Sequence, residues 1–179
     1  MVYIVLGKGF EEAEAVIPCD LLRRAGVDAK FVGIGSASVA GGHGITVQAD
    51  CVAEETDLTQ ADMIVLPGGL GGVASILASE TILSAVKTMH DNGKYIAAIC
   101  AAPTIFAKLD LVDGKKATCY PGMENEMGNA IMCDEDAVYD GKIITGRAAG
   151  TAFAFGLKLV EVLCGTEMAK KIATGVVSR

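Results

Sequence analysis

Short runs of apolar residues without a charged side chain constrain the fold of this chain more than any other feature. Three of them, Val2–Leu6, Met63–Leu66 and Tyr95–Ile99, contain β-branched residues and are separated by longer stretches with helical periodicity. A strand with one face in water would alternate apolar and polar residues, so these runs predict strands buried on both faces. Such strands alternating with helices indicate an α/β fold, with a mostly parallel sheet and helices on both faces.

The remaining pattern adds further strands, helices and two hairpins. Pro18 lies inside the first predicted helix, which should therefore kink or restart there. The turn pair Asp140-Gly141 predicts a hairpin of residues 137–139 with 142–145, and a Gly-rich segment predicts another within 38–48. The other predicted strands are 29–32 and 117–120, and the predicted helices are 11–25, 73–90 with a break near Ser79, a segment after Ile99, 151–164 and 167–174.

Composition limits the class of protein. Hydrophobic residues make up 51% and charged residues 21% of the 179 residues, which excludes a disordered chain. No apolar run approaches the roughly 20 residues that span a bilayer. Since no linker or repeat interrupts the chain, we expect one domain over residues 1–179, and since no basic leader opens it, we expect a cytoplasmic protein. The net charge of −7 argues against a dedicated nucleic-acid surface or a membrane partner.

Six cysteines are scattered through the chain without a CxxC pair or a Cys/His cluster. Their spacing predicts no zinc site and no other metal site. A chain long enough to bury a core in a reducing compartment has little need of disulfides. Most of the cysteines are therefore expected to be small buried apolar residues; the six are Cys19, Cys51, Cys100, Cys119, Cys133 and Cys164.

Cys100 differs from the others in its position. It directly follows the predicted strand Tyr95–Ile99 and precedes a predicted helix, with alanines on both sides of the turn. This is the arrangement of a nucleophile elbow, whose strained backbone requires small neighbours. The positive end of the helix would favour the thiolate. We therefore predict that Cys100 is a nucleophile; the alternative is a buried cysteine that only ends the strand.

A second strand ends in the pair Gly68-Gly69. The carboxyl ends of parallel strands meet at one edge of the sheet, so this turn should lie near Cys100. Backbone N–H groups in a Gly-rich turn can donate to a developing oxyanion. An ordinary turn is the alternative interpretation.

Three acids and two histidines could assist a thiol. Glu14, in the first turn of the first helix, could share a hydrogen bond with it, but Glu11 and Glu12 are equally placed and the residues alone do not choose among them. His90 ends a helix, where a structural role is expected. His43, at a hairpin tip, could reach the site or a partner subunit, or could be an exposed loop residue. Neither histidine follows a strand, so no Cys–His dyad is predicted.

Four segments together resemble the ThiJ/PfpI superfamily, and within it the branch of the parkinsonism-associated deglycases and their bacterial relatives. They are residues 9–18 (Gly-Phe-Glu-Glu-Ala-Glu-Ala-Val-Ile-Pro), 66–69 (Leu-Pro-Gly-Gly), 97–103 (Ala-Ala-Ile-Cys-Ala-Ala-Pro) and 147–151 (Arg-Ala-Ala-Gly-Thr). The resemblance covers essentially the whole chain in order. It implies a flavodoxin-like three-layer sandwich that forms a homodimer.

The resemblance also implies roles for individual residues. Cys100 would be the reactive thiol, and Glu14 a protonated carboxylic acid that hydrogen-bonds it and directs its oxidation. Gly69 and Ala101 would be the backbone donors of the oxyanion hole. The implied activity is cofactor-free glyoxalase or deglycase chemistry on a small aldehyde or a glycated substrate. The alternative is an oxidative-stress sensor or chaperone that uses an oxidisable cysteine without significant turnover.

One segment departs from the pattern. Several members of the superfamily place a histidine before a proline after the elbow helix, and Tyr120 stands at that position here. Because the ordinary pKa of tyrosine is about 10, it is a poor general base at neutral pH, and we expect no peptidase activity. Turnover with Glu14 as the proton carrier should be slow. Tyr120, His43 and Cys119 are predicted as possible pocket residues, although a packed strand residue is the preferred interpretation of Cys119.

Overall fold

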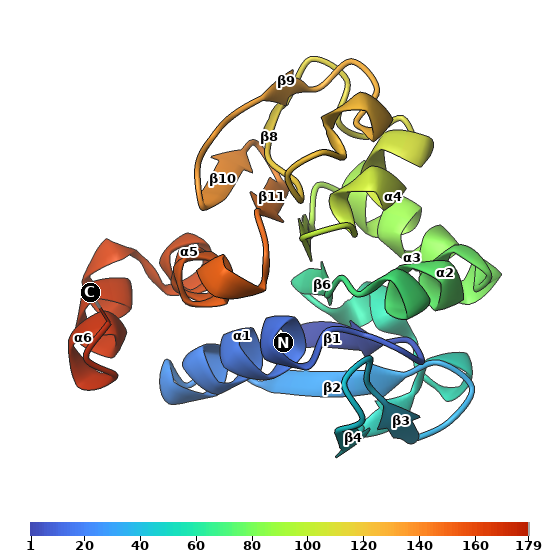
Figure 1. Cartoon of the computed structure of the whole chain (residues 1–179). Coiled ribbons are helices and arrows are strands. Elements are labelled where there is room, and N and C mark those ends of the chain that lie inside the picture. The colour runs from blue at the N-terminus through green and yellow to red at the C-terminus, as the bar shows by residue number, and fades with distance from the viewer. Residues whose placement is uncertain (179) are drawn as a thin grey trace.

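The computed structural model describes residues 1–178, and a seven-stranded sheet forms its centre (Figure 1). The strand order is β10-β11-β7-β6-β1-β2-β5, and every neighbouring pair is parallel except β10 with β11. The predicted sheet is thus confirmed. The strands are β1 Val2–Leu6, β2 Ala29–Gly33, β5 Cys51–Val52, β6 Met63–Leu66, β7 Tyr95–Ile99, β10 Ala137–Asp140 and β11 Ile143–Gly146.

Helices cover both faces of the sheet, so the flavodoxin-like three-layer sandwich is also confirmed (Figure 1). Neighbouring residues of one strand enter opposite cores. Ile64 belongs to the core that α2, α3 and α4 complete, and Val65 belongs to the core that α1, α5 and α6 complete. The helices are α1 Glu12–Arg24, α2 Leu70–Leu77, α3 Glu80–Asp91, α4 Pro103–Lys108, α5 Ala152–Cys164 and α6 Thr166–Gly175. Short 3₁₀ helices span Ala53–Glu55, Leu58–Gln60, Glu124–Glu126 and Ala149–Thr151.

Helix α1 runs without interruption past Pro18, so the predicted restart is wrong. Pro18 lies against α5 at Gly156, where an added Cβ would come within 2.7 Å of Leu21 and 3.1 Å of the Pro18 Cα. The two helices can approach this closely because Gly156 has no side chain. The predicted break near Ser79 is confirmed, since the Ser79 side chain accepts from the N–H of Ile82 and caps α3.

Two small sheets lie outside the main one. Strand β3 (Ser38–Ala40) pairs antiparallel with β4 (Thr46–Gln48), as predicted. Strand β8 (Lys116–Ala117) pairs in parallel with β9 (Ile131–Met132), and residues 118–120, predicted as strand, are not. Their backbone groups bind elsewhere: the N–H of Thr118 donates to the Thr145 hydroxyl and the N–H of Tyr120 to the carbonyl of Cys100.

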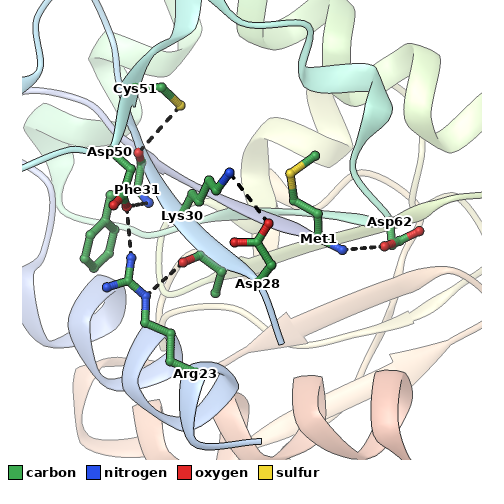
Figure 2. A network of polar contacts seen from close by, with 9 residues as sticks. Met1, Arg23, Asp28, Lys30, Phe31, Asp50, Cys51 and Asp62 are labelled. Atoms are coloured by element: carbon green, nitrogen blue, oxygen red, sulfur yellow. Dashed lines mark hydrogen bonds and ion pairs between the residues drawn. The ribbon is translucent and has the colours of Figure 1, made fainter. Parts of the chain in front are cut away.

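A polar network joins α1 to the amino ends of the strands (Figure 2). Arg23 donates to the carbonyl of Ala29 at 2.8 Å and pairs with Asp50 at 2.9 Å, and Asp50 accepts from the N–H of Phe31 at 2.7 Å. The N-terminal ammonium of Met1 pairs with Asp62. Exposed pairs like these contribute little stability each. These contacts lie at the amino ends of the strands, and Cys100 lies at the opposite, carboxyl edge of the sheet.

Within residues 1–178, no single helix is long and apolar enough to cross a membrane. Helices α2 and α3 reach the required length and apolar composition only when they are taken together, and the chain bends by 82° between them.

Candidate active site

Cys100 lies in the turn between β7 and α4 with a φ of +67°, which side chains other than glycine rarely adopt. Two hydrogen bonds hold this conformation. The Cys100 N–H donates to the carbonyl of Gly146 at 3.0 Å, and the Cys100 carbonyl accepts from the N–H of Tyr120 at 2.7 Å. The neighbouring Ala101 and Ala102 are buried. The strained turn of the predicted elbow is therefore present at the carboxyl edge of the sheet.

Glu14 of α1 is fully buried and lies beside this turn. Its Oε2 accepts from the N–H of Gly68 at 2.8 Å. A Cβ added to Gly68 would lie 2.7 Å from that oxygen and 2.8 Å from the Cβ of Cys100, so the acid and the cysteine both approach the space that a side chain at this glycine would fill. The thiol interacts with the carboxyl, but Oε1 is buried and has no hydrogen bond of standard geometry. The structure thus chooses Glu14 among the three acids.

Burial raises the pKa of Glu14 from 4.5 to about 7, although the Gly68 N–H and the Cys100 thiol lower it in part. One hydrogen bond does not compensate a carboxylate for the loss of water. At neutral pH the carboxyl therefore holds its proton for a large fraction of the time. In the protonated form, the hydroxyl of Glu14 can donate a hydrogen bond, and the Cys100 sulfur is the acceptor beside it.

Burial, and then the charge of Glu14, raise the pKa of the Cys100 thiol to about 12, against smaller effects of the Ala101 and Gly69 N–H groups. The predicted preference of this thiol for the thiolate is therefore wrong. Helix α4 has six residues and a weak dipole, while the carboxyl lies next to the sulfur. Because Glu14 gains and loses its proton near neutral pH while the thiol keeps its own, the pair carries at most one negative charge there, and that charge lies mainly on the carboxyl. A thiolate at Cys100 requires the proton to be on Glu14.

The N–H groups of Gly69 and Ala101 lie near enough to the Cys100 thiol to lower its pKa in part. Gly69 has a φ of +81°, and an added Cβ would come within 2.6 Å of the Gly9 carbonyl oxygen and 2.7 Å of the Glu11 nitrogen. Only glycine fits this turn, which packs against the loop after β1. The two predicted donors thus lie together beside the thiol.

A pocket of about 440 Å³ opens above the thiol. Tyr120 lines it, as predicted, with about half of its side chain exposed. Four lining residues, Leu70, Pro121, Gly122 and Met123, were not predicted, because nothing in their spacing marks them. The lining residues are Glu11, Gly69, Leu70, Cys100, Ala101, Tyr120, Pro121, Gly122 and Met123.

His43 lies outside this pocket and contacts Glu12 instead. Its Nδ1 is 3.1 Å from the Glu12 Oε2 and 3.4 Å from the Glu11 Oε2. Glu12 also accepts from the N–H groups of His43 and Ile45, at 2.8 and 3.2 Å. The ligand atoms of Glu11, Glu12 and His43 lie within 4.8 Å of one another and could hold a metal ion, an arrangement that the spacing did not predict. In the structure these hydrogen bonds fasten the β3–β4 hairpin to α1.

Cys119 lies outside the pocket as well. Its side chain is buried, and burial raises the pKa of the thiol to about 11. It lines a separate cavity of about 200 Å³ together with Cys133 and Arg147. The predicted pocket role of Cys119 is not supported by this placement, and its alternative interpretation as a packed residue fits it.

Comparison with known proteins agrees with this geometry. Residues 1–162 match the DJ-1/PfpI family. The chain belongs to the DJ-1/PfpI family. It is 36% identical to protein dj-1beta of Drosophila melanogaster over 97% of this chain and 94% of that one. It is 30% identical to a protein named as a deglycase from Pyrococcus abyssi, over 90% of this chain and 98% of that one.

Solved structures of the family show the same fold. The crystal structure of Drosophila melanogaster DJ-1beta superposes with a TM-score of 0.93, at 34% identity, and covers 99% of this chain and 97% of that one. Oxidized DJ-1 of Toxoplasma gondii superposes with a TM-score of 0.91, at 33% identity, and covers 98% of this chain and 97% of that one. The resemblance seen in the sequence motifs is therefore confirmed over the whole fold.

Proposed function

We propose that this DJ-1/PfpI protein is a slow, cofactor-free glyoxalase or deglycase whose nucleophile is Cys100. The observation that carries the proposal is the contact between Cys100 and the fully buried Glu14, whose pKa is raised to about 7. A carboxyl that exchanges its proton near neutral pH beside a thiol is suited to general acid–base catalysis. The named deglycase among the relatives supports the same class of reaction.

The first step would be addition of the Cys100 sulfur to the aldehyde carbon of methylglyoxal. A carbon–sulfur bond forms, Glu14 carries the thiol proton, and the aldehyde oxygen becomes the oxyanion of a hemithioacetal. The N–H groups of Gly69 and Ala101, which already lie beside the sulfur, would stabilise that oxyanion.

The second step would be an internal redox reaction. Glu14 would first return the thiol proton to the hemithioacetal oxyanion, so that its carboxylate is again a base. It would then take the proton of the former aldehyde carbon and deliver it to the neighbouring carbon, while the hydroxyl proton passes from the first oxygen to the second, so that the first carbon is oxidised to a thioester and the second is reduced to an alcohol. Water then hydrolyses the thioester, which releases lactate and restores the thiol. A glycated amine would enter as its hemiaminal. Since no histidine lines the pocket in the described part of the chain, we propose no peptidase activity.

The direct test is lactate formation from methylglyoxal by the wild type and by Cys100→Ser. We expect no turnover by Cys100→Ser with unchanged circular dichroism. The matched control is Cys164→Ser, which removes an exposed cysteine far along the chain in α5 and should keep full activity. Full activity of Cys100→Ser would refute the proposal.

A second candidate function is oxidation sensing at the same cysteine. The supporting observation is the unpartnered, buried Oε1 of Glu14, because a protonated carboxyl there could hydrogen-bond a sulfinate on Cys100. Peptide mass spectrometry after peroxide treatment should then find oxygen on Cys100 before the other five cysteines. Uniform oxidation would argue against this function. Suppression of aggregation that persists in Cys100→Ala would indicate a passive chaperone instead.

We also propose a cytoplasmic homodimer. Val16 of α1 and Ile45 of the β3–β4 hairpin leave 43% and 58% of their surfaces exposed, which is consistent with an apolar contact between copies. Sedimentation equilibrium should give twice the chain mass, and Val16→Glu with Ile45→Glu should lower it to that of the monomer. A monomeric wild type would contradict this assembly.

A further inference from the structure

The pocket over Cys100 has an apolar wall that a very small aldehyde would not need. Leu70, the first residue of α2, leaves 79% of its surface exposed, and Tyr120 leaves 48% exposed. Both line the pocket, with Met123 and Pro121 beside them. Single exposed apolar residues are common, but apolar side chains around a nucleophile form a binding surface.

The position of this wall is fixed relative to the sulfur. Leu70 directly follows Gly69, and both residues line the same pocket as Cys100. The backbone N–H of Tyr120 donates to the carbonyl of Cys100 at 2.7 Å. A substituent attached to the reacting carbonyl would therefore contact Leu70 and Tyr120 when the aldehyde carbon reaches the sulfur.

The charged side chain that lines the pocket is acidic. Glu11 lines it, and no lysine, arginine or histidine of residues 1–178 does. Behind Glu11 lies Glu12, and the adjacent His43 offsets part of their charge, since it lies 3.1 Å from Glu12 and 3.4 Å from Glu11. Glu14 adds a further negative charge whenever it is ionised. The carboxylate of Glu11 would repel an anionic group on a substrate bound in the pocket, whereas it would not repel a neutral group.

We propose that the site selects neutral α-oxoaldehydes with an apolar or aromatic substituent, and that Leu70 and Glu11 determine this selectivity. The inference rests on the proposed function of Cys100. Leu70 and Tyr120 favour the apolar substituent, and Glu11 disfavours a carboxylate or phosphate on the substrate. Phosphorylated and carboxylated aldehydes are then poor substrates.

The test compares kcat/KM for methylglyoxal, phenylglyoxal and para-carboxyphenylglyoxal, of which the last two differ only in a carboxylate. We expect phenylglyoxal to exceed methylglyoxal by roughly tenfold. We expect para-carboxyphenylglyoxal to fall below phenylglyoxal by roughly tenfold. If methylglyoxal is turned over and kcat/KM is equal for all three aldehydes, the proposed selectivity is overturned and the proposed function stands. If none of the three aldehydes is turned over, the proposed function is overturned as well.

Two variants assign the effects to residues. Leu70→Ala should remove most of the preference for phenylglyoxal over methylglyoxal, while Ile131→Ala, which truncates an exposed apolar residue outside the pocket, should preserve it. Glu11→Gln should raise kcat/KM for para-carboxyphenylglyoxal by roughly fivefold, while Glu80→Gln on the exposed start of α3 should not. Unchanged ratios in Leu70→Ala and Glu11→Gln would overturn the assignment.

Discussion

Glu12 and Glu14 lie two residues apart in the first turn of α1, and both are buried, yet their surroundings shift the two pKa values in opposite directions. Glu12 accepts three hydrogen bonds from the β3–β4 hairpin, and although burial alone would raise its pKa, these bonds with its own N–H hold the pKa below its ordinary value. Glu14 accepts one from Gly68, and burial raises its pKa to about 7. Burial sets the cost of a charge, but the number of donors decides whether the carboxyl is ionised. The first acid fastens a hairpin, and the second is free to exchange a proton with Cys100.

The largest expected difference between Glu12 and Glu14 is in catalysis. Replacing Glu14 by Gln should lower kcat/KM for methylglyoxal by at least roughly 100-fold, because the proton carrier beside the sulfur is lost. Replacing Glu12 by Gln should change it less than about threefold in steady-state assays. Equal losses in the two variants would show that the acids do not differ in function.

The second prediction concerns stability and pH. Because the folded pKa of Glu14 lies above its unfolded value of 4.5, the folded state binds more protons between pH 4.5 and about 7, and stability falls as pH rises through this window. The contribution should reach about 3 kcal/mol. Urea unfolding at a series of pH values should show it as a steeper decline in wild type than in Glu14→Gln. Parallel pH profiles would contradict the raised pKa.

Glu12 should have the opposite dependence on pH. Its lowered pKa means that its stabilising contribution is present above pH 4.5 and is lost as pH falls through the folded pKa. At neutral pH, Glu12→Ala should lower the free energy of unfolding by about 1 to 2 kcal/mol, because the N–H groups of His43 and Ile45 lose their acceptor. Hydrogen exchange should accelerate at those two amides and not at Gly68. Unchanged protection at both would show that the hairpin is held by other contacts.

The smallest effect is expected at His43. The hydrogen bond to Glu12, and then the charges of Glu11 and Glu12, raise the pKa of this exposed imidazole above 6.5. Any stabilisation from the pair is present below pH 6.5 and is lost as pH rises through the raised pKa. An NMR titration should find the pKa above 6.5 in wild type and lower in Glu12→Gln. A pKa that Glu12→Gln leaves unchanged would contradict the contact.

The main sheet and the elbow were predictable because both depend on local sequence. Buried strands need continuous apolar runs, and the turn after β7 needs small residues on both sides of Cys100. The strand β5 was not predicted because it has two residues and, within residues 1–178, pairs with β2 alone. Residues 118–120 were misassigned because their backbone donors bind Thr145 and Cys100, which lie far away in the sequence.

The chemistry of the site was less predictable than its position. Three acids stand near the start of α1, and only the packing of Glu14 against Gly68 distinguishes it from the other two. The same packing places a carboxyl against Cys100 and raises the pKa of the thiol, which local sequence could not indicate. The contact of His43 with Glu12 joins residues 31 positions apart, and sequence spacing contains no signal for it.

The most direct test of the account is to locate the covalent adduct. Wild type and Glu14→Gln are mixed with methylglyoxal, quenched with acid and analysed by peptide mass spectrometry. We predict an adduct of one methylglyoxal on Cys100 that accumulates in Glu14→Gln. In this variant solvent can still take the thiol proton during addition, whereas the proton transfer between the two carbons, which completes turnover, is lost. An adduct spread over all six cysteines, or absent from Cys100 in both proteins, would contradict the account.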